Sequence, residues 1–184
     1  MVLCRAGEVL MLRRSMTMPF APGMHVFPGG GVSAVDKHSS DPLRACALRE
    51  THEEVDIVVE ECSLFDRWIT PEIEDRRYDV SFYLADVEDA GRLVTTEAES
   101  MLWIPPAQAL ERHQRGRFPM LRPTRIVLEN LVAGPTDCAE PLAKLPRMRP
   151  DGLWDVIDAS TGRVLLTVAD GPTVSESDGR PSQR

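Results

Sequence analysis

The chain has 184 residues, a length typical of one domain, and its 21 basic and 29 acidic residues give a net charge of −8. This balance excludes a generally basic protein that binds nucleic acid through its phosphates, and it argues against docking on anionic membranes. A hydrophobic fraction of 42% is too high for a chain that is disordered throughout. No apolar run reaches the roughly 18 residues that a membrane-spanning helix needs.

Short apolar runs and turn residues predict a mixture of helices and strands in chain order. A helix is expected over residues 42–55, because Ser40 or Asp41 can cap its start and Pro42 suits its first position. Strands are expected at 8–14, 24–27, 57–65, 78–87 and 100–104, further helices at 107–113 and 124–133, and a hairpin from 152–157 and 163–168. The elements lack the regular βαβ alternation of a doubly wound fold.

The end of the helix predicted at 42–55 carries three carboxylates on one face. Glu50, Glu53 and Glu54 stand at i, i+3 and i+4, within an arc of about 100° that is apolar in the preceding turns. Like charges at this spacing repel, and a helix C-terminus favours cations by roughly 0.3–1 kcal/mol each. A hard divalent cation such as Mg²⁺ would remove these costs. The alternative is an exposed charge run, in which Arg49 pairs with Glu53 one turn away.

A second feature is the run Pro28-Gly29-Gly30-Gly31, which breaks any regular element. Consecutive glycines allow the backbone to approach a ligand closely, although a plain tight turn explains the run equally well. Neither the P-loop pattern nor the dinucleotide-binding GxGxxG follows a predicted strand.

The segment from Gly30 onward resembles the signature of the Nudix hydrolases, G-x5-E-x7-R-E-U-x-E-E-x-G-U, where U is apolar. The matching residues are Arg49, Glu50, Glu53, Glu54 and Ile57. The chain departs from the signature in three places. Asp36 or Asp41 replaces the first Glu of the signature. If Asp36 is the equivalent residue, the segment between it and Arg49 is five residues longer than in the signature. Thr51 replaces an apolar residue, and Asp56 replaces the final Gly. Because Asp adopts the left-handed conformation better than most residues, the helix exit should survive.

The preceding residues are similar to a more specific pattern. LMLRRS, Gly23 and FPGG resemble the motif before the box in coenzyme A diphosphatases, LLTxR[SA]-x3-R-x3-G-x3-FPGG. Arg14, Ser15 and Gly23 fit this motif, whereas Leu12 and Pro19 replace its Thr and its second Arg. The resemblance extends over most of residues 8–133.

The resemblance implies an α/β fold, the Nudix α/β/α sandwich with a mixed, partly curled β-sheet, as one domain over residues 1–169. Residues 170–184 are predicted to be a disordered tail from their composition. Mg²⁺ or Mn²⁺ would be held against a diphosphate, and the metal ligands would be Glu50, Glu53 and Glu54. Arg49 would orient these glutamates.

Further site residues follow from the same resemblance. Gly29 and Gly30 would shape the substrate loop, and Arg14 would bind phosphate or else form a surface ion pair. Glu50 and Glu53 would take part in catalysis. The general base would be Glu50 or an acidic residue on a later loop, where Glu97 and Glu99 stand in TTEAES. Of the last two we favour Glu99, and the alternative is that both are solvated loop residues.

The implied reaction is attack of water on one phosphorus of a nucleoside diphosphate linked to another moiety. Coenzyme A or acyl-CoA is the favoured substrate, and ADP-ribose, NADH or a nucleoside triphosphate are alternatives. A Nudix-fold module that senses a nucleotide without cleaving it is the alternative from another class. The four cysteines form no CxxC pair, which predicts reduced thiols and a cytoplasmic protein. A homodimer is a candidate by analogy alone.

Overall fold

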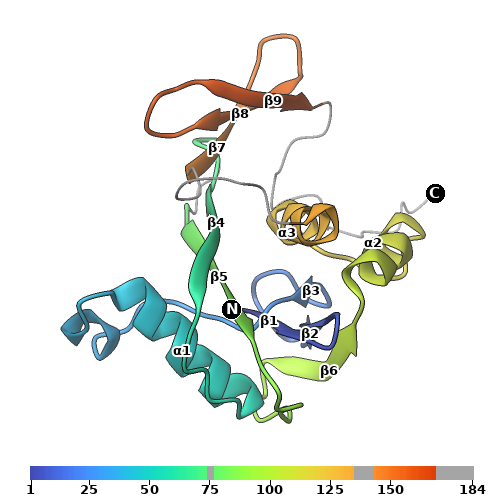
Figure 1. Cartoon of the computed structure of the whole chain (residues 1–184). Coiled ribbons are helices and arrows are strands. Elements are labelled where there is room, and N and C mark those ends of the chain that lie inside the picture. The colour runs from blue at the N-terminus through green and yellow to red at the C-terminus, as the bar shows by residue number, and fades with distance from the viewer. Residues whose placement is uncertain (74–76, 135–142, 169–184) are drawn as a thin grey trace.

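The computed structural model describes residues 1–73, 77–134 and 143–168 (Figure 1). The tail predicted at 170–184 and Cys138 lie outside the described residues. The strands are β1 (Val2–Arg5), β2 (Glu8–Arg14), β3 (His25–Val26), β4 (Ser63–Ile69), β5 (Asp79–Asp86), β6 (Ala98–Ile104), β7 (Ala143–Met148), β8 (Trp154–Asp158) and β9 (Val164–Val168). The helices are η1 (Asp36–His38), α1 (Pro42–Val55), α2 (Pro106–Gln114) and α3 (Arg122–Ala133). No described helix is long and apolar enough to cross a membrane.

The nine strands of the described residues form one mixed sheet. Its main path runs in the order β3-β2-β1-β5-β4-β7-β8-β9, and β6 pairs with β2 outside this path. Parallel pairing joins β1 to β5 and β4 to β7, and the other neighbours are antiparallel. Because β2 pairs with β1, β3 and β6 along its length, the sheet branches at this strand.

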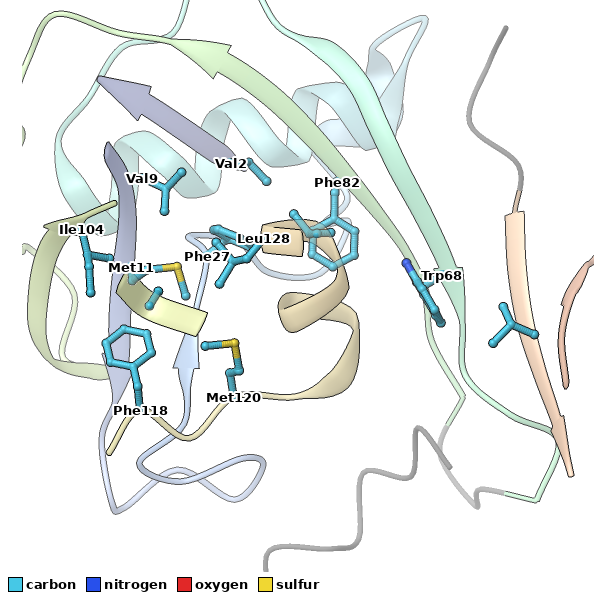
Figure 2. Packing of buried hydrophobic residues seen from close by; sticks show 13 residues of the cluster. Val2, Val9, Met11, Phe27, Trp68, Phe82, Ile104, Phe118, Met120 and Leu128 are labelled. Carbon is cyan, nitrogen blue, oxygen red and sulfur yellow. The ribbon is translucent and has the colours of Figure 1, made fainter. Parts of the chain in front are cut away.

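Successive residues of β2 point to opposite faces of the sheet, and both faces are covered. Val9 and Met11 join the cluster under α2 and α3, which Figure 2 shows together with Leu128 of α3. Leu10 and Leu12 join a second cluster under α1. A strand buried on both faces reads as a continuous apolar run rather than as an alternating one. The expected sandwich is therefore confirmed, with α1 on one side of the sheet and α2 and α3 on the other (Figure 1).

The signals predicted at both ends of α1 are confirmed. The Asp41 carboxylate accepts a hydrogen bond from Arg44 N at 3.0 Å, and Pro42 occupies the first helical position. Asp56 ends the helix in the left-handed conformation, with φ 56° and ψ 32°, and donates its N–H to His52 O. The three glutamates therefore lie in the last two turns of α1.

The sequence placed three strands wrongly or missed them. The strand expected at 57–65 begins only at Ser63, because the residues after the left-handed exit form a loop. The missed β1 pairs with β2 through a two-residue turn at Ala6 and Gly7, which both have positive φ. The missed β7 contains Pro146, which argues against a strand. The structure accommodates this proline because β4 pairs only with the first two residues of β7.

A buried polar cluster joins the C-terminal strands to the rest of the molecule. Asp66 of β4 is fully buried and accepts hydrogen bonds from Lys144 Nζ of β7, Trp68 Nε1 and Asn130 Nδ2 of α3. The Lys144 ammonium also lies 5.4 Å from the centroid of the Trp68 ring. These contacts connect β4, α3 and β7 at one point of the core.

We expect Lys144→Met to lower the free energy of unfolding by about 3 kcal/mol, because it removes the cation that faces a buried carboxylate. The midpoint of urea denaturation measures this change. The control is Arg125→Ala, which removes a more exposed ion pair with Glu129 and should cost less than about 1 kcal/mol. Equal costs for the two variants would contradict the structural role of the cluster.

Candidate active site

The loop of residues 28–31 is fixed against the last turns of α1. Gly29 N donates to Glu54 Oε2 at 2.8 Å, and Gly30 O accepts a weak hydrogen bond from Cys46 Sγ at 3.6 Å. Gly30 also lies directly against a carboxylate, since a Cβ built on it would stand 2.4 Å from Glu50 Oε1 and 2.5 Å from Glu50 Cδ. Only glycine leaves room for the Glu50 carboxylate in this position.

Arg49 is the centre of the hydrogen bonds around the glutamates. Its Nη1 donates to Glu53 Oε2 at 2.8 Å and forms an ion pair with Glu50 Oε1 at 2.9 Å. Its Nε and Nη2 donate to the two oxygens of Asp36 at 3.0 and 2.8 Å, and Nη2 also reaches Gly31 O at 3.3 Å. The planar guanidinium fork therefore holds two of the three glutamates and the preceding loop at once.

Asp36, in η1, is almost completely buried at 3% exposure. Besides the Arg49 fork it accepts hydrogen bonds from Ser33 N at 2.7 Å and from Ser33 Oγ at 2.8 Å. Arg49 first and the Ser33 N–H next hold the pKa of Asp36 well below its usual range. Asp41 caps α1 instead. Of the two aspartates considered for the first acidic position of the signature, Asp36 is thus the one that contacts Arg49.

The Glu54 side chain is buried among other acidic groups. Burial above all, against the opposing Gly29 N–H and with the nearby charges of Glu50 and Glu97 adding to it, raises the pKa of Glu54 to about 7. Glu97 lies on the loop before β6. In the same loop, Thr95 N donates to the backbone oxygen of Glu54 at 3.4 Å. The structure therefore brings both Glu50 and Glu97 within electrostatic range of Glu54.

Two other predicted residues are engaged with the loop of residues 15–23. Glu99 Oε1 accepts from Met16 N at 3.1 Å, and Glu99 Oε2 lies 3.6 Å from Arg13 Nη1. Arg14 Nε donates to Phe20 O at 3.1 Å, so this guanidinium braces the loop. Of the two later glutamates, Glu97 is the one whose charge contributes to the raised pKa of Glu54.

Sequence reasoning missed Ser33 and the contact between Asp56 and Arg92. Ser33 stands three residues before Asp36, a spacing at which a hydroxyl and an N–H can reach a following carboxylate, so it was in principle detectable. Arg92 lies 36 residues from Asp56, and its Nε donates to Asp56 Oδ2 at 2.7 Å. No local sequence pattern indicates a contact between residues so far apart in the chain.

Residues 1–123 match the family model described as NUDIX domain. The chain belongs to the Nudix family. A Caenorhabditis elegans protein provisionally named nudix hydrolase 7 is 29% identical to it, over 63% of this chain and 52% of that protein. The chain therefore spans about half the length of this curated relative.

Solved structures of Nudix proteins share the fold. A NUDIX hydrolase from Alicyclobacillus acidocaldarius is 28% identical, with a TM-score of 0.67 over 74% of this chain and 90% of its own. The mMutator MutT protein from Bacillus halodurans (16% identity, TM-score 0.59) covers 90% of this chain and 92% of its own. The NUDIX domain of Shewanella oneidensis NrtR, solved with ADP ribose (18% identity, TM-score 0.57), covers 72% and 82%. The last two likenesses concern the fold alone.

We expect Asp36→Asn to destabilise the protein at neutral pH, and the difference from wild type to shrink progressively as pH falls below about 4. Because the pKa of Asp36 is lowered in the folded state, its stabilising contribution is complete above the unfolded value near 4 and is lost only as pH falls through the lower folded value. Urea denaturation of wild type and variant at a series of pH values, from 7 down to the lowest at which both proteins fold, measures the difference. Asp41→Asn is the control, because Asn still caps a helix, and it should change stability little at any of these pH values. A pH-independent difference for Asp36→Asn would refute the electrostatic cause.

Proposed function

We propose that the protein hydrolyses the diphosphate linkage of a nucleoside diphosphate derivative with the help of Mg²⁺ or Mn²⁺. The observation that carries this proposal is the packing of the glycine loop, residues 28–31, against several neighbouring carboxylates at the end of α1. Gly29 and Gly30 contact Glu54 and Glu50, and Glu97 lies within electrostatic range of Glu54. In such a site the carboxylate oxygens of α1 can bind a metal ion, and the backbone groups of the glycine loop lie opposite them.

The donor set suits a hard cation, although within residues 1–73, 77–134 and 143–168 no three acidic, His or Cys side chains form a preformed cage. The raised pKa of Glu54 reflects burial of the carboxyl group first and the negative charges of Glu50 and Glu97 second, and a divalent cation would offset both by stabilising the carboxylate. We propose Glu50, Glu53 and Glu54 as the residues that would hold it. When bound, the ion would neutralise charge on the diphosphate and lower the pKa of a water molecule.

The remaining residues of the site have distinct proposed roles. Arg49 orients Glu50 and Glu53, since one guanidinium nitrogen contacts both carboxylates. Glu97 is the better-placed general base of the two later glutamates because it lies near Glu54, and Glu50 is the alternative base. Gly30 sets the position of Glu50 by leaving room for its carboxylate. Positioning and electrostatics are the main contributions expected for this reaction.

Coenzyme A or acyl-CoA is the substrate that we propose. The support is the motif of Arg14, Ser15 and Gly23 before the glycine loop, together with its location. Ser15 N donates to Glu97 O at 2.8 Å, so the loop that carries this motif lies beside the acidic site. The ADP ribose bound by the Shewanella NUDIX domain makes that compound the main comparison substrate.

Two features of the chain support the single domain and the cytoplasmic location that we propose together with this function. The described residues share one continuous sheet, which supports a single domain over residues 1–169. Cys4, Cys46 and Cys62 are free thiols, which supports a reducing, cytoplasmic environment.

The test is product analysis with coenzyme A, ADP-ribose, NADH and dGTP in the presence of Mg²⁺ or Mn²⁺. We expect coenzyme A to be cleaved fastest, into phosphopantetheine and 3′,5′-ADP, and Glu53→Gln to lower kcat by orders of magnitude. A preference for ADP-ribose would reject the proposed substrate, and full activity of Glu53→Gln would reject the proposed ligands. Metal-dependent binding without cleavage of any compound would favour the sensor alternative.

Gly30→Ala should lower kcat at least about tenfold, because its methyl group displaces the Glu50 carboxylate by about an ångström or more. The control is the neighbouring Gly31→Ala, whose added Cβ would meet nothing within 4 Å and whose carbonyl is retained. Steady-state rates on the best substrate, with melting temperatures for both variants, measure the effect. Equal rates for the two alanine variants would show that the close approach at Gly30 is irrelevant to the reaction.

A further inference from the structure

The end of α1 is tied to the loop of residues 87–97, which runs from β5 to β6 past this end of the helix (Figure 1). Arg92 N donates to Val55 O at 2.9 Å, and Val94 N donates to Glu54 O at 2.9 Å. Glu54 therefore directs its carboxyl group into the site and its carbonyl group to this loop. The same loop ends in Glu97, so its position controls where this carboxylate lies.

The loop approaches the helix end closely at Gly91. This residue has φ +63°, and a Cβ built on it would stand 2.6 Å from Val55 O and 2.7 Å from Ile57 Cδ1. Trp103 Nε1 holds the preceding residue, Ala90, by donating to its carbonyl oxygen at 2.9 Å. The start of the loop is thus packed against the exit of α1 rather than extended into solvent.

Among the described residues, Asp56 makes the one side-chain hydrogen bond from the helix exit to this loop. Its Oδ2 accepts from Arg92 Nε at 2.7 Å, and its Oδ1 lies 3.8 Å from His52 Nδ1. The backbone of Asp56 is left-handed with φ 56°, a conformation that glycine adopts at lower cost. A glycine at this position, as in the signature, would have no side chain to reach Arg92.

We propose that Asp56 is a positioning residue, which acts through Arg92 to hold the loop of residues 87–97 so that Glu97 stays beside Glu54. This inference rests on the proposed function, in which Glu97 acts in the reaction. The ion pair is partly exposed, with side-chain exposures of 37% for Asp56 and 77% for Arg92. Its effect on the rate is therefore modest, about fivefold, which corresponds to the roughly 1 kcal/mol available from such a pair.

The test compares Asp56→Gly and Arg92→Ala in the full chain. Asp56→Gly should keep or raise the melting temperature, because glycine relieves the left-handed backbone, and yet it should lower kcat about fivefold with little change in KM. Arg92→Ala should lower kcat similarly, and the double variant should be no slower than either. The matched control is Arg115→Ala, which removes an exposed 2.7 Å pair with Glu111 on α2 and should leave kcat unchanged.

A second comparison links the effect to Glu97. On the residual rate of Glu97→Gln, adding Asp56→Gly should cause no further loss. A further fivefold loss in that background would overturn the link to Glu97. Full rates for Asp56→Gly and Arg92→Ala, with Glu53→Gln inactive, would overturn the positioning role and leave the proposed function standing. An inactive wild-type protein would instead overturn the proposed function and this inference with it.

Discussion

The arrangement of the acidic site depends on the guanidinium of Arg49. Glu50 and Glu53 carry like charges at helical spacing near a helix C-terminus, where both their mutual repulsion and the helix dipole disfavour them. One nitrogen of Arg49 contacts both carboxylates, and the other two bind Asp36. A lysine could not make these contacts together, because its ammonium is a point charge without a fork. The same side chain therefore offsets the repulsion and joins the preceding loop to the helix.

This local arrangement is useful only because the sheet fixes α1. Leu10 and Leu12 of β2 face the helix, where Ala47 and Val55 belong to the same apolar cluster. The alternate residues of β2 face α2 and α3. The glycine loop follows β3, which also pairs with β2. One strand thus sets the position of both halves of the site, the helix through packing and the loop through the backbone.

The sequence predicted the features that depend on near neighbours. The cap at Asp41, the first-turn Pro42 and the face of carboxylates follow from spacing along one helix, and all are present. The choice between Asp36 and Asp41 needed the tertiary contact to Arg49, which spans the five additional loop residues. The contacts of Glu99 with Met16 and Arg13 were not predictable from local spacing, because these partners come from a segment more than 80 residues earlier.

The departures from the Nudix signature are each matched by a specific contact. The shorter Asp36 is held by Ser33 in addition to Arg49. Thr51 is fully buried where the signature has an apolar residue, and its hydroxyl donates to Ala47 O at 2.7 Å within the helix, so no polar group is left unsatisfied. Asp56 adopts the left-handed exit of the glycine that it replaces and adds a contact to Arg92. The three substitutions thus leave the guanidinium, the glutamates and the helix exit in the arrangement that the proposed hydrolysis requires.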